Sequence, residues 1–316
     1  MKLAVAATFA CLLAACAWLG GSFPNDATES LIVDGVTREY FIHIPPSYAR
    51  GHPVALVLDF HGGLGTPNGA RRISGLDPVA DRHGFIVVYP RGLNRHWNDG
   101  RNATLANEAD VHFVTALIDK LERDYSIDTS RVDAAGISNG GIFSLRLACE
   151  LGGRIAAVAS VAGSMAAPIA PHCRPPWPVS VLMINGLQDP LVPYGGGIVA
   201  ANTEQAGPVL SVAQSIALWK TLDHCPAKPH QIRLPDAVPD DGTHTSGAFY
   251  NPCRGGSAVE SLAIAGAGHT WPGGLQYLPV FLIGKTSHDF NASETIWQFF
   301  AAHPKPGAIF TQLPRS

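Results

Sequence analysis

The sequence has little charge and lacks the usual signatures of nucleic-acid, metal and cofactor binding. Only 15% of its 316 residues are charged, the net charge is −3, and Lys and Arg form no run. A nucleic-acid partner would need a basic surface, so none is expected. The sequence contains no HExxH, no CxxC spacing, no GxGxxG and no P-loop motif. We therefore predict that the protein uses no metal and no cofactor.

The N-terminus has the pattern of an export signal. Residues 3–15 are almost entirely apolar, a stretch too short to span a bilayer. Residues 13–16 form the tetrapeptide LAAC, which resembles the lipobox of bacterial lipoproteins and would make Cys16 the lipidated first residue. Ordinary cleavage near Ala15 or Ala17 is the alternative. Either route predicts an extracellular or periplasmic protein, and the first route adds a lipid anchor at Cys16 as its only membrane contact.

Four cysteines remain after the signal, as expected for an oxidising compartment. They are Cys149, Cys173, Cys225 and Cys253. Three pairings are open, and four buried free thiols are the alternative. The nearest-neighbour pairs, Cys149 with Cys173 and Cys225 with Cys253, are favoured because each closes a loop of moderate length. Each would stabilise the fold by about 3 kcal/mol.

Short apolar runs alternate with amphipathic segments along the chain. The runs predict strands at residues 54–60, 85–89, 132–137, 155–161, 179–185 and 259–264. Helices are predicted at residues 105–125, in the dozen residues after Ser138, and at residues 209–222 and 293–303. A hairpin around Asp34-Gly35 comes first, at residues 31–44. This order predicts an α/β fold with a mostly parallel central sheet and helices on both faces.

We divide the chain into a signal peptide (residues 1–15), a short tether (16–27), one large domain (28–305) and a C-terminal tail (306–316). Two stretches rich in Gly and Pro, residues 168–178 and 235–247, are interpreted as loop insertions above the sheet edge.

The pentapeptide Gly136-Ile137-Ser138-Asn139-Gly140 matches the G-x-S-x-G nucleophile elbow. In that motif a tight turn between a buried strand and a helix exposes a serine hydroxyl above the sheet. A serine needs an adjacent base and a carboxylate behind it, in the chain order Ser, acid, His. Ser138 is therefore the predicted nucleophile.

Two later strand ends supply the predicted partners of Ser138. Asp189 follows the strand at residues 179–185, although an aspartate before proline is also a common turn former. His269 lies in a glycine-flanked loop after the strand at residues 259–264. It is preferred for its chain order and setting over the other histidines weighed, which are His61, His112, His244 and His288.

The oxyanion hole of a nucleophile elbow combines the amide after the serine with one from an earlier strand loop. The sequence offers Asn139 and the loop that begins at His61, in which Leu64 is the favoured donor and Gly63 the alternative. The alternative is that the glycines of this loop form only a turn after the strand and have no part in an oxyanion hole. Trp97, Trp271 and His61 are predicted to line the substrate pocket, with plain packing as the alternative for the tryptophans.

Three segments around these residues carry a family resemblance. Ser138 lies in GISNGG, Asp189 in GLQDPLVPY and His269 in GAGHTWPGG, and together these resemble the polyhydroxybutyrate depolymerase and feruloyl esterase family. The resemblance implies an exported α/β-hydrolase that cleaves hydroxyalkanoate oligomers or feruloyl or acetyl esters through an acyl-enzyme. It also implies that Cys225 and Cys253 brace the region before the histidine.

No separate polymer-binding module is apparent, which argues against an insoluble polymer as the preferred substrate. Two other functions stay open. The same triad could transfer its acyl group to a sugar hydroxyl at the cell surface, or the chain could be an inactive, lipid-anchored binding protein on a hydrolase scaffold.

Overall fold

The structure is a computed structural model that describes residues 26–102, 109–199 and 207–306. The predicted signal peptide, Cys16 and nearly all of the tether lie outside these residues. The strands are β1 (Asp26–Val33), β2 (Val36–His43), β3 (Val54–Phe60), β4 (Ile86–Pro90), β5 (Ile127–Ile137), β6 (Ala157–Val161), β7 (Ser180–Gly186), β8 (Gly197–Ile198), β9 (Pro208–Val209), β10 (His230–Arg233), β11 (His244–Tyr250) and β12 (Val259–Ala265). The helices are α1 (Pro67–Ser74), α2 (Asp77–His83), α3 (Ala109–Asp124), α4 (Asn139–Glu150), α5 (Val212–Leu222), α6 (Val280–Ile283) and α7 (Ala292–Ala302).

One large sheet organises the domain, with the strand order β1-β2-β4-β3-β5-β6-β7-β12-β11-β10. The six strands from β4 to β12 in this order run parallel. The β1–β2 hairpin flanks them at one edge, and β11 and β10 extend the other edge in antiparallel fashion. The prediction of a mostly parallel sheet is confirmed.

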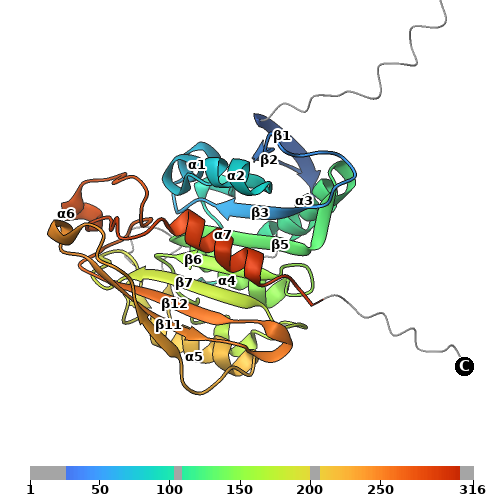
Figure 1. Cartoon of the computed structure of the whole chain (residues 1–316). Coiled ribbons are helices and arrows are strands. Elements are labelled where there is room, and N and C mark those ends of the chain that lie inside the picture. Colours follow the sequence, from blue (N-terminus) through green and yellow to red (C-terminus); the bar gives the residue numbers. More distant parts are fainter. Residues whose placement is uncertain (1–25, 103–108, 200–206, 307–316) are drawn as a thin grey trace, which may run out of the picture.

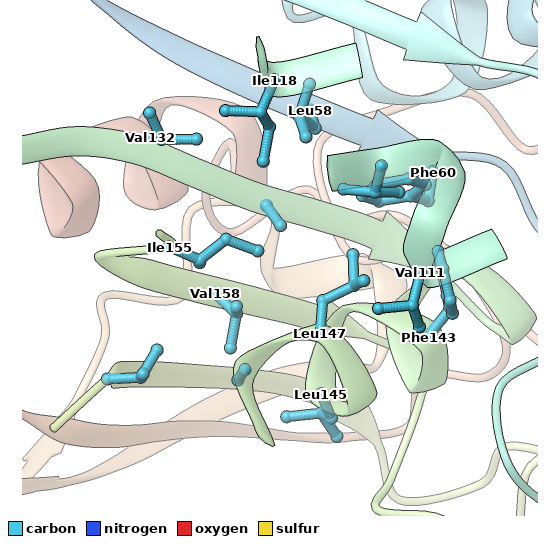
Figure 2. Close-up of a cluster of buried hydrophobic side chains, with 14 of the residues drawn as sticks. Leu58, Phe60, Val111, Ile118, Val132, Phe143, Leu145, Leu147, Ile155 and Val158 are labelled. Carbon is cyan, nitrogen blue, oxygen red and sulfur yellow. The ribbon is translucent and has the colours of Figure 1, made fainter. Parts of the chain in front are cut away.

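Helices cover both faces of this sheet, as predicted. Helices α3, α4 and α5 pack on one face, and α1, α2 and α7 pack on the other (Figure 1), so each face has its own apolar core. Neighbouring residues of a strand alternate between the two cores: Leu56 and Leu58 of β3 join the first, and Val57 joins the second. Figure 2 shows the first core, where Leu58 and Phe60 lie close to side chains of α3 and α4.

The predicted elements are present with shifted ends, and several short elements were missed. The strand β1 starts at Asp26, two residues before the predicted start of the domain. β11 starts at His244, inside the stretch interpreted as a loop insertion. Of the predicted helix at residues 105–125, residues 105–108 lie outside the described part of the chain.

Helices α1 and α2 were missed because they have only eight and seven residues, too few to display a helical period. Their boundaries are nevertheless marked in the sequence. Each has proline in its first turn and ends at a glycine in the left-handed conformation, Gly75 and Gly84.

Two disulfides join the four predicted cysteines in the favoured pattern, Cys149 with Cys173 and Cys225 with Cys253. The first ties α4 to the loop between β6 and β7, and the second ties the segment just after α5 to the segment before β12. Among the described helices, none is long and apolar enough to cross a membrane.

Candidate active site

Ser138 stands at the sharp turn between β5 and α4, in the middle of the parallel sheet. Its backbone has φ 59° and ψ −123°, a region that non-glycine residues rarely adopt. The turn is held by hydrogen bonds on both sides of the serine. The Ser138 amide donates to the Val161 carbonyl of β6 at 2.9 Å, and the Ser138 carbonyl accepts from the Ile142 amide of α4 at 2.9 Å.

The glycines of the elbow are required by close packing of backbone on backbone. A Cβ atom on Gly140 would lie 2.0 Å from the Phe60 carbonyl oxygen at the end of β3, and one on Gly136 would lie 2.6 Å from the Gly140 carbonyl carbon. Any side chain at either position would push α4 away from the sheet. The G-x-S-x-G spacing is therefore a packing requirement of this turn.

His269 and Asp189 form a buried pair at the ends of two neighbouring strands. The Nδ1 atom of His269 lies 2.7 Å from Oδ2 of Asp189, and both side chains are almost fully buried. The second carboxylate oxygen of Asp189 accepts the amides of Leu191 and Val192, each at 2.8 Å. With these acceptor positions filled, the carboxylate has a fixed orientation toward the imidazole.

The loops after β7 and β12 hold this pair in place. The Gln188 amide donates to the Ala267 carbonyl at 3.0 Å, and a Cβ atom on Gly186 would lie 2.4 Å from the Gly268 carbonyl oxygen. From the other side, the Tyr277 hydroxyl donates to the His269 carbonyl at 2.9 Å. The two loops thus pack as one unit, although 80 residues separate the aspartate from the histidine.

The loop after β3 lies directly against the elbow. A Cβ atom on Gly62 would be 3.4 Å from the Ser138 Cβ, and one on Gly63 would be 3.9 Å from the Asn139 Cβ. The Gly65 amide donates to the Gly62 carbonyl at 2.9 Å, which closes a tight turn with Leu64 at φ 59°. This turn brings the predicted oxyanion donors Gly63 and Leu64 beside the nucleophile.

The side chain of Asn139 is clamped by residues 97–99. Its Oδ1 accepts the Trp97 amide at 2.8 Å, and its Nδ2 donates to the Trp97 carbonyl at 2.9 Å and to Asp99 Oδ2 at 2.6 Å. Asp99 is also paired with Arg101 at 2.8 Å. Burial raises the pKa of the Asp99 carboxyl, and the Arg101 guanidinium opposes that shift. Asn139, which directly follows the nucleophile in the chain, is therefore held in place by its side chain as well as by its backbone.

A cavity of about 490 Å³ opens over these groups. Its lining includes the predicted residues His61, Gly63, Leu64, Ser138, Asn139 and His269. It also includes residues that the sequence did not single out, among them Ile73, His96, Arg101, Leu191, Val199, Tyr277 and Leu278. Arg101 lies four residues after Trp97, and this closeness in the chain to a predicted pocket residue was the one signal that could have pointed to it.

The two tryptophans do not line this cavity, which corrects the expectation of a pocket role. Trp97 is fully buried, and its indole N–H donates to the His61 carbonyl at 3.0 Å. Trp271 is equally buried and donates to the Ser293 hydroxyl at 3.0 Å. Both fill space beneath the site, because their single polar atom already has a partner inside the fold.

His61 reaches the cavity but is mainly a structural link. Its Nδ1 donates to the Gly62 carbonyl at 2.8 Å, and its Nε2 accepts the Gly92 amide at 3.0 Å. Burial lowers the pKa of His61 to about 4, so the ring is neutral at neutral pH. Two other histidines weighed from the sequence, His112 and His244, are exposed and pair with Asp34 and Asp236, away from the cavity.

The comparisons with known proteins place the chain in a family. A family model described as "Putative esterase" matches residues 35–224. The chain is 35% identical to the putative esterase NocK of Nocardia uniformis, over 87% of this chain and 83% of that protein. The chain belongs to this esterase family. The protein is therefore a carboxylic-ester hydrolase.

Other proteins that are similar to this esterase carry the names feruloyl esterase and acetyl xylan esterase. It is 27% identical to feruloyl esterase B of Piromyces equi over 73% of its own length, but it spans only 42% of that longer protein. The structure of an acetyl xylan esterase from Aspergillus awamori superimposes with a TM-score of 0.58 at 14% identity, covering 87% of this chain and 99% of the other. That similarity establishes the α/β-hydrolase fold. The family match ends at residue 224, before His269.

Proposed function

We propose that this esterase hydrolyses its substrates through a triad of Ser138, His269 and Asp189. The observation that carries the proposal is the cavity that Ser138 and His269 both line, with Asp189 bonded to the far nitrogen of the imidazole. Asp189 fixes the tautomer with hydrogen on Nδ1, which leaves Nε2 as the proton acceptor. The pair can therefore take the proton from the serine hydroxyl as it attacks the ester carbonyl.

The oxyanion of the tetrahedral intermediate is bound by two backbone amides. One is that of Asn139, the first residue of α4, whose N–H has no partner within the helix. The other comes from the turn after β3, with Leu64 as the favoured donor and Gly63 as the alternative. The positive end of the α4 dipole adds to the stabilisation of the negative charge.

Collapse of the intermediate expels the alcohol, which receives its proton from His269, and leaves an acyl group on Ser138. Water then repeats the sequence with His269 again as base, and the acid is released. The steps require only groups that the chain itself supplies. Hydroxyalkanoate oligomers and feruloyl or acetyl esters are the proposed substrates, in keeping with the family resemblance and the named relatives.

We also propose that the protein is exported, with Cys16 as a lipidated N-terminus. Two disulfides support export, because disulfides persist in oxidising compartments. The mass of the mature protein, compared with that of a Cys16→Ser variant, tests the anchor. A mature chain that starts after Cys16, or carries no added lipid, would contradict it.

The function is tested by rates on ethyl ferulate, p-nitrophenyl acetate and hydroxybutyrate oligomers, each compared with the Ser138→Ala variant. We expect hydrolysis of at least one ester and its loss in the variant. Preference for ferulate would indicate an aromatic acyl pocket, and preference for the oligomers a storage polyester. Equal rates for the two proteins would refute the triad, and acyl transfer to an added sugar in place of hydrolysis would indicate a transferase.

A further inference from the structure

Arg101 is a buried cation on the wall of the catalytic cavity. It lines the cavity although only 7% of its surface is exposed. Its side-chain Nε donates to Oδ2 of Asp99 at 2.8 Å, and neither terminal nitrogen has a hydrogen-bond partner in the described part of the chain. The terminal nitrogens are also not among the enclosed polar atoms that lack a partner. Arg101 therefore presents unused N–H donors to the cavity.

Asp99 fixes the position of this guanidinium relative to the nucleophile. Its Oδ2 accepts Arg101 Nε and also, at 2.6 Å, Nδ2 of Asn139, the residue that follows Ser138. Its Oδ1 accepts the Arg101 backbone amide at 3.1 Å. Arg101 and the oxyanion side of the site are thus joined through one carboxylate. A group bound to the guanidinium would lie at a set distance from Ser138.

The backbone of Arg101 is held from a second side. A Cβ atom on Gly207 would clash with the Arg101 carbonyl, so these two backbones are in close contact. The Gly207 carbonyl accepts the Val199 amide at 3.2 Å, and Val199 also lines the cavity. Arg101 is therefore fixed between Asp99 and the β8–β9 hairpin, as a group that orients a ligand must be.

The formal charge on the wall of the cavity is positive. Among the described residues that line it, Arg101 is the only one with a permanent charge, and none is Asp or Glu. Its partner Asp99 is not part of the lining. The other ionisable groups on the wall are His61, His96, His269 and Tyr277. A cavity that carries a cation and no carboxylate favours a negatively charged group on its ligand.

The unused edge of the guanidinium fits a carboxylate. The two terminal nitrogens of an arginine can donate two parallel hydrogen bonds to the two oxygens of one carboxylate. Asp99 occupies Nε, so a second carboxylate would bind on the opposite side of the guanidinium. Burying a cation with unused donors costs free energy, and an ionic ligand offsets that cost better than a neutral oxygen does.

We propose that Arg101 is a specificity residue that binds a carboxylate on the substrate, so that the enzyme prefers esters with a free carboxylate near the scissile bond. The inference rests on the proposed function, because it places the substrate in the same cavity. The carboxylate belongs either to the acyl part, as in a monoester of a dicarboxylic acid, or to the alcohol part, as in an acylated hydroxy acid. Both present the same group to Arg101.

The test compares esters that differ only in charge. For the acyl part, monoethyl glutarate is paired with its neutral amide, ethyl 4-carbamoylbutanoate. For the alcohol part, 3-acetoxybutanoate is paired with 3-acetoxybutanamide. In at least one pair we expect a higher kcat/KM for the carboxylate, and Arg101→Gln should lower the carboxylate-to-amide ratio by about 10 to 100-fold. Arg101→Lys, which keeps the charge but not the planar fork, should restore part of the ratio.

The ratio separates substrate binding from a purely structural role of Arg101. Both esters of a pair undergo the same reaction, so a general loss of activity in Arg101→Gln leaves their ratio unchanged. Arg95→Gln is the matched control, because Arg95 lies six residues earlier in the same loop, is exposed and does not line the cavity. We expect its ratio to equal that of the unsubstituted protein. Thermal unfolding shows whether each variant is folded.

Three results would overturn the proposal. The first is an unchanged ratio in Arg101→Gln for both pairs. The second is an equal fall in Arg95→Gln, which would indicate long-range attraction only. The third is a fall in His96→Gln but not in Arg101→Gln.

Absence of any Ser138-dependent hydrolysis would refute the proposed function instead. The role of Arg101 is then decided by calorimetry, with the two carboxylate esters titrated into the Ser138→Ala protein. We expect binding of at least one of them to be weakened about tenfold or more when Arg101→Gln is added. Equal affinities with and without this second substitution would contradict the role of Arg101.

Discussion

The Nδ1 atom of His269 lies 2.7 Å from Oδ2 of Asp189, with both side chains almost completely shielded from solvent. A buried carboxylate in this position orients the imidazole and stabilises it when it gains a proton. The pair is assembled from the ends of β7 and β12, which are adjacent parallel strands of the sheet. The catalytic proposal depends on this relationship more than on any single sequence motif.

Replacing Asp189 with asparagine should therefore reduce turnover strongly while leaving substrate binding similar. The amide can donate to Nδ1 and so favour the wrong tautomer, with hydrogen on Nε2. We expect kcat to fall by about 10³ to 10⁴-fold with little change in KM. Steady-state kinetics on p-nitrophenyl acetate provides the measurement. A loss below tenfold would mean that Asp189 only shapes its loop.

Replacing Asn139 with alanine should slow the reaction because the backbone amide that binds the oxyanion is held less firmly. The variant keeps the backbone donor but loses the side-chain clamp to Trp97 and Asp99. We expect kcat to fall by about 10-fold or more with KM nearly unchanged, since the amide binds mainly the transition state. Aspartate at this position would place a second carboxylate beside Asp99, and Asn139→Asp should be worse than alanine. A rise in KM at constant kcat would contradict the assignment.

Replacing Trp97 with alanine should destabilise the protein without changing which ester it prefers. The indole stacks on Phe143 with a centroid distance of 5.2 Å and lies edge-on to Phe60. Its removal from this core should cost about 3 to 5 kcal/mol of unfolding free energy. The ratio of kcat/KM for ethyl ferulate to that for p-nitrophenyl acetate should stay constant, whereas Leu191→Ala, inside the cavity, should change it. A changed ratio for Trp97→Ala would restore the pocket role.

The buried carboxyl of Asp59 should make stability depend on pH. Burial raises the pKa of Asp59 to about 7 in the folded chain, above its ordinary value. A carboxyl group whose pKa is higher in the folded chain than in the unfolded chain stabilises the fold at pH values below its unfolded pKa. That contribution is lost as the pH rises toward 7. Relative to Asp59→Asn, the unfolding free energy should therefore fall between pH 4 and pH 8, by at most about 4 kcal/mol. Denaturant unfolding across this range is the measurement, with the exposed Asp240→Asn as control. The prediction would be wrong if the unfolding free energies of the unsubstituted protein and of Asp59→Asn changed with pH in the same way.

The parallel core of the fold could be predicted because its strands are buried on both faces and are therefore apolar throughout. β3 and the second half of β5 stand out in this way, and the G-x-S-x-G turn follows β5 directly. The antiparallel strand β11, which lies between β12 and the edge strand β10, could not be recognised, because it is only partly buried and has a mixed composition. The hairpin β1–β2 was recognised by its Asp34-Gly35 turn.

The triad residues could be predicted because chain order and strand ends constrain them. The lining of the cavity could not, because it depends on side-chain direction. Trp97 lies in the loop after β4 and was expected to face the substrate. Its indole instead points into the fold and donates to the His61 carbonyl. Arg101 and Tyr277 reach the cavity from loops whose course no local pattern specifies.

The most direct test of the account is covalent labelling of the nucleophile. The protein is incubated with a fluorophosphonate, which reacts with activated serines, and the labelled peptide is identified by mass spectrometry. We predict one label on Ser138, none in Ser138→Ala, and much slower labelling in Asp189→Asn. Absence of any label, or a label on a different serine, would contradict the claim that Ser138 is the nucleophile of this esterase.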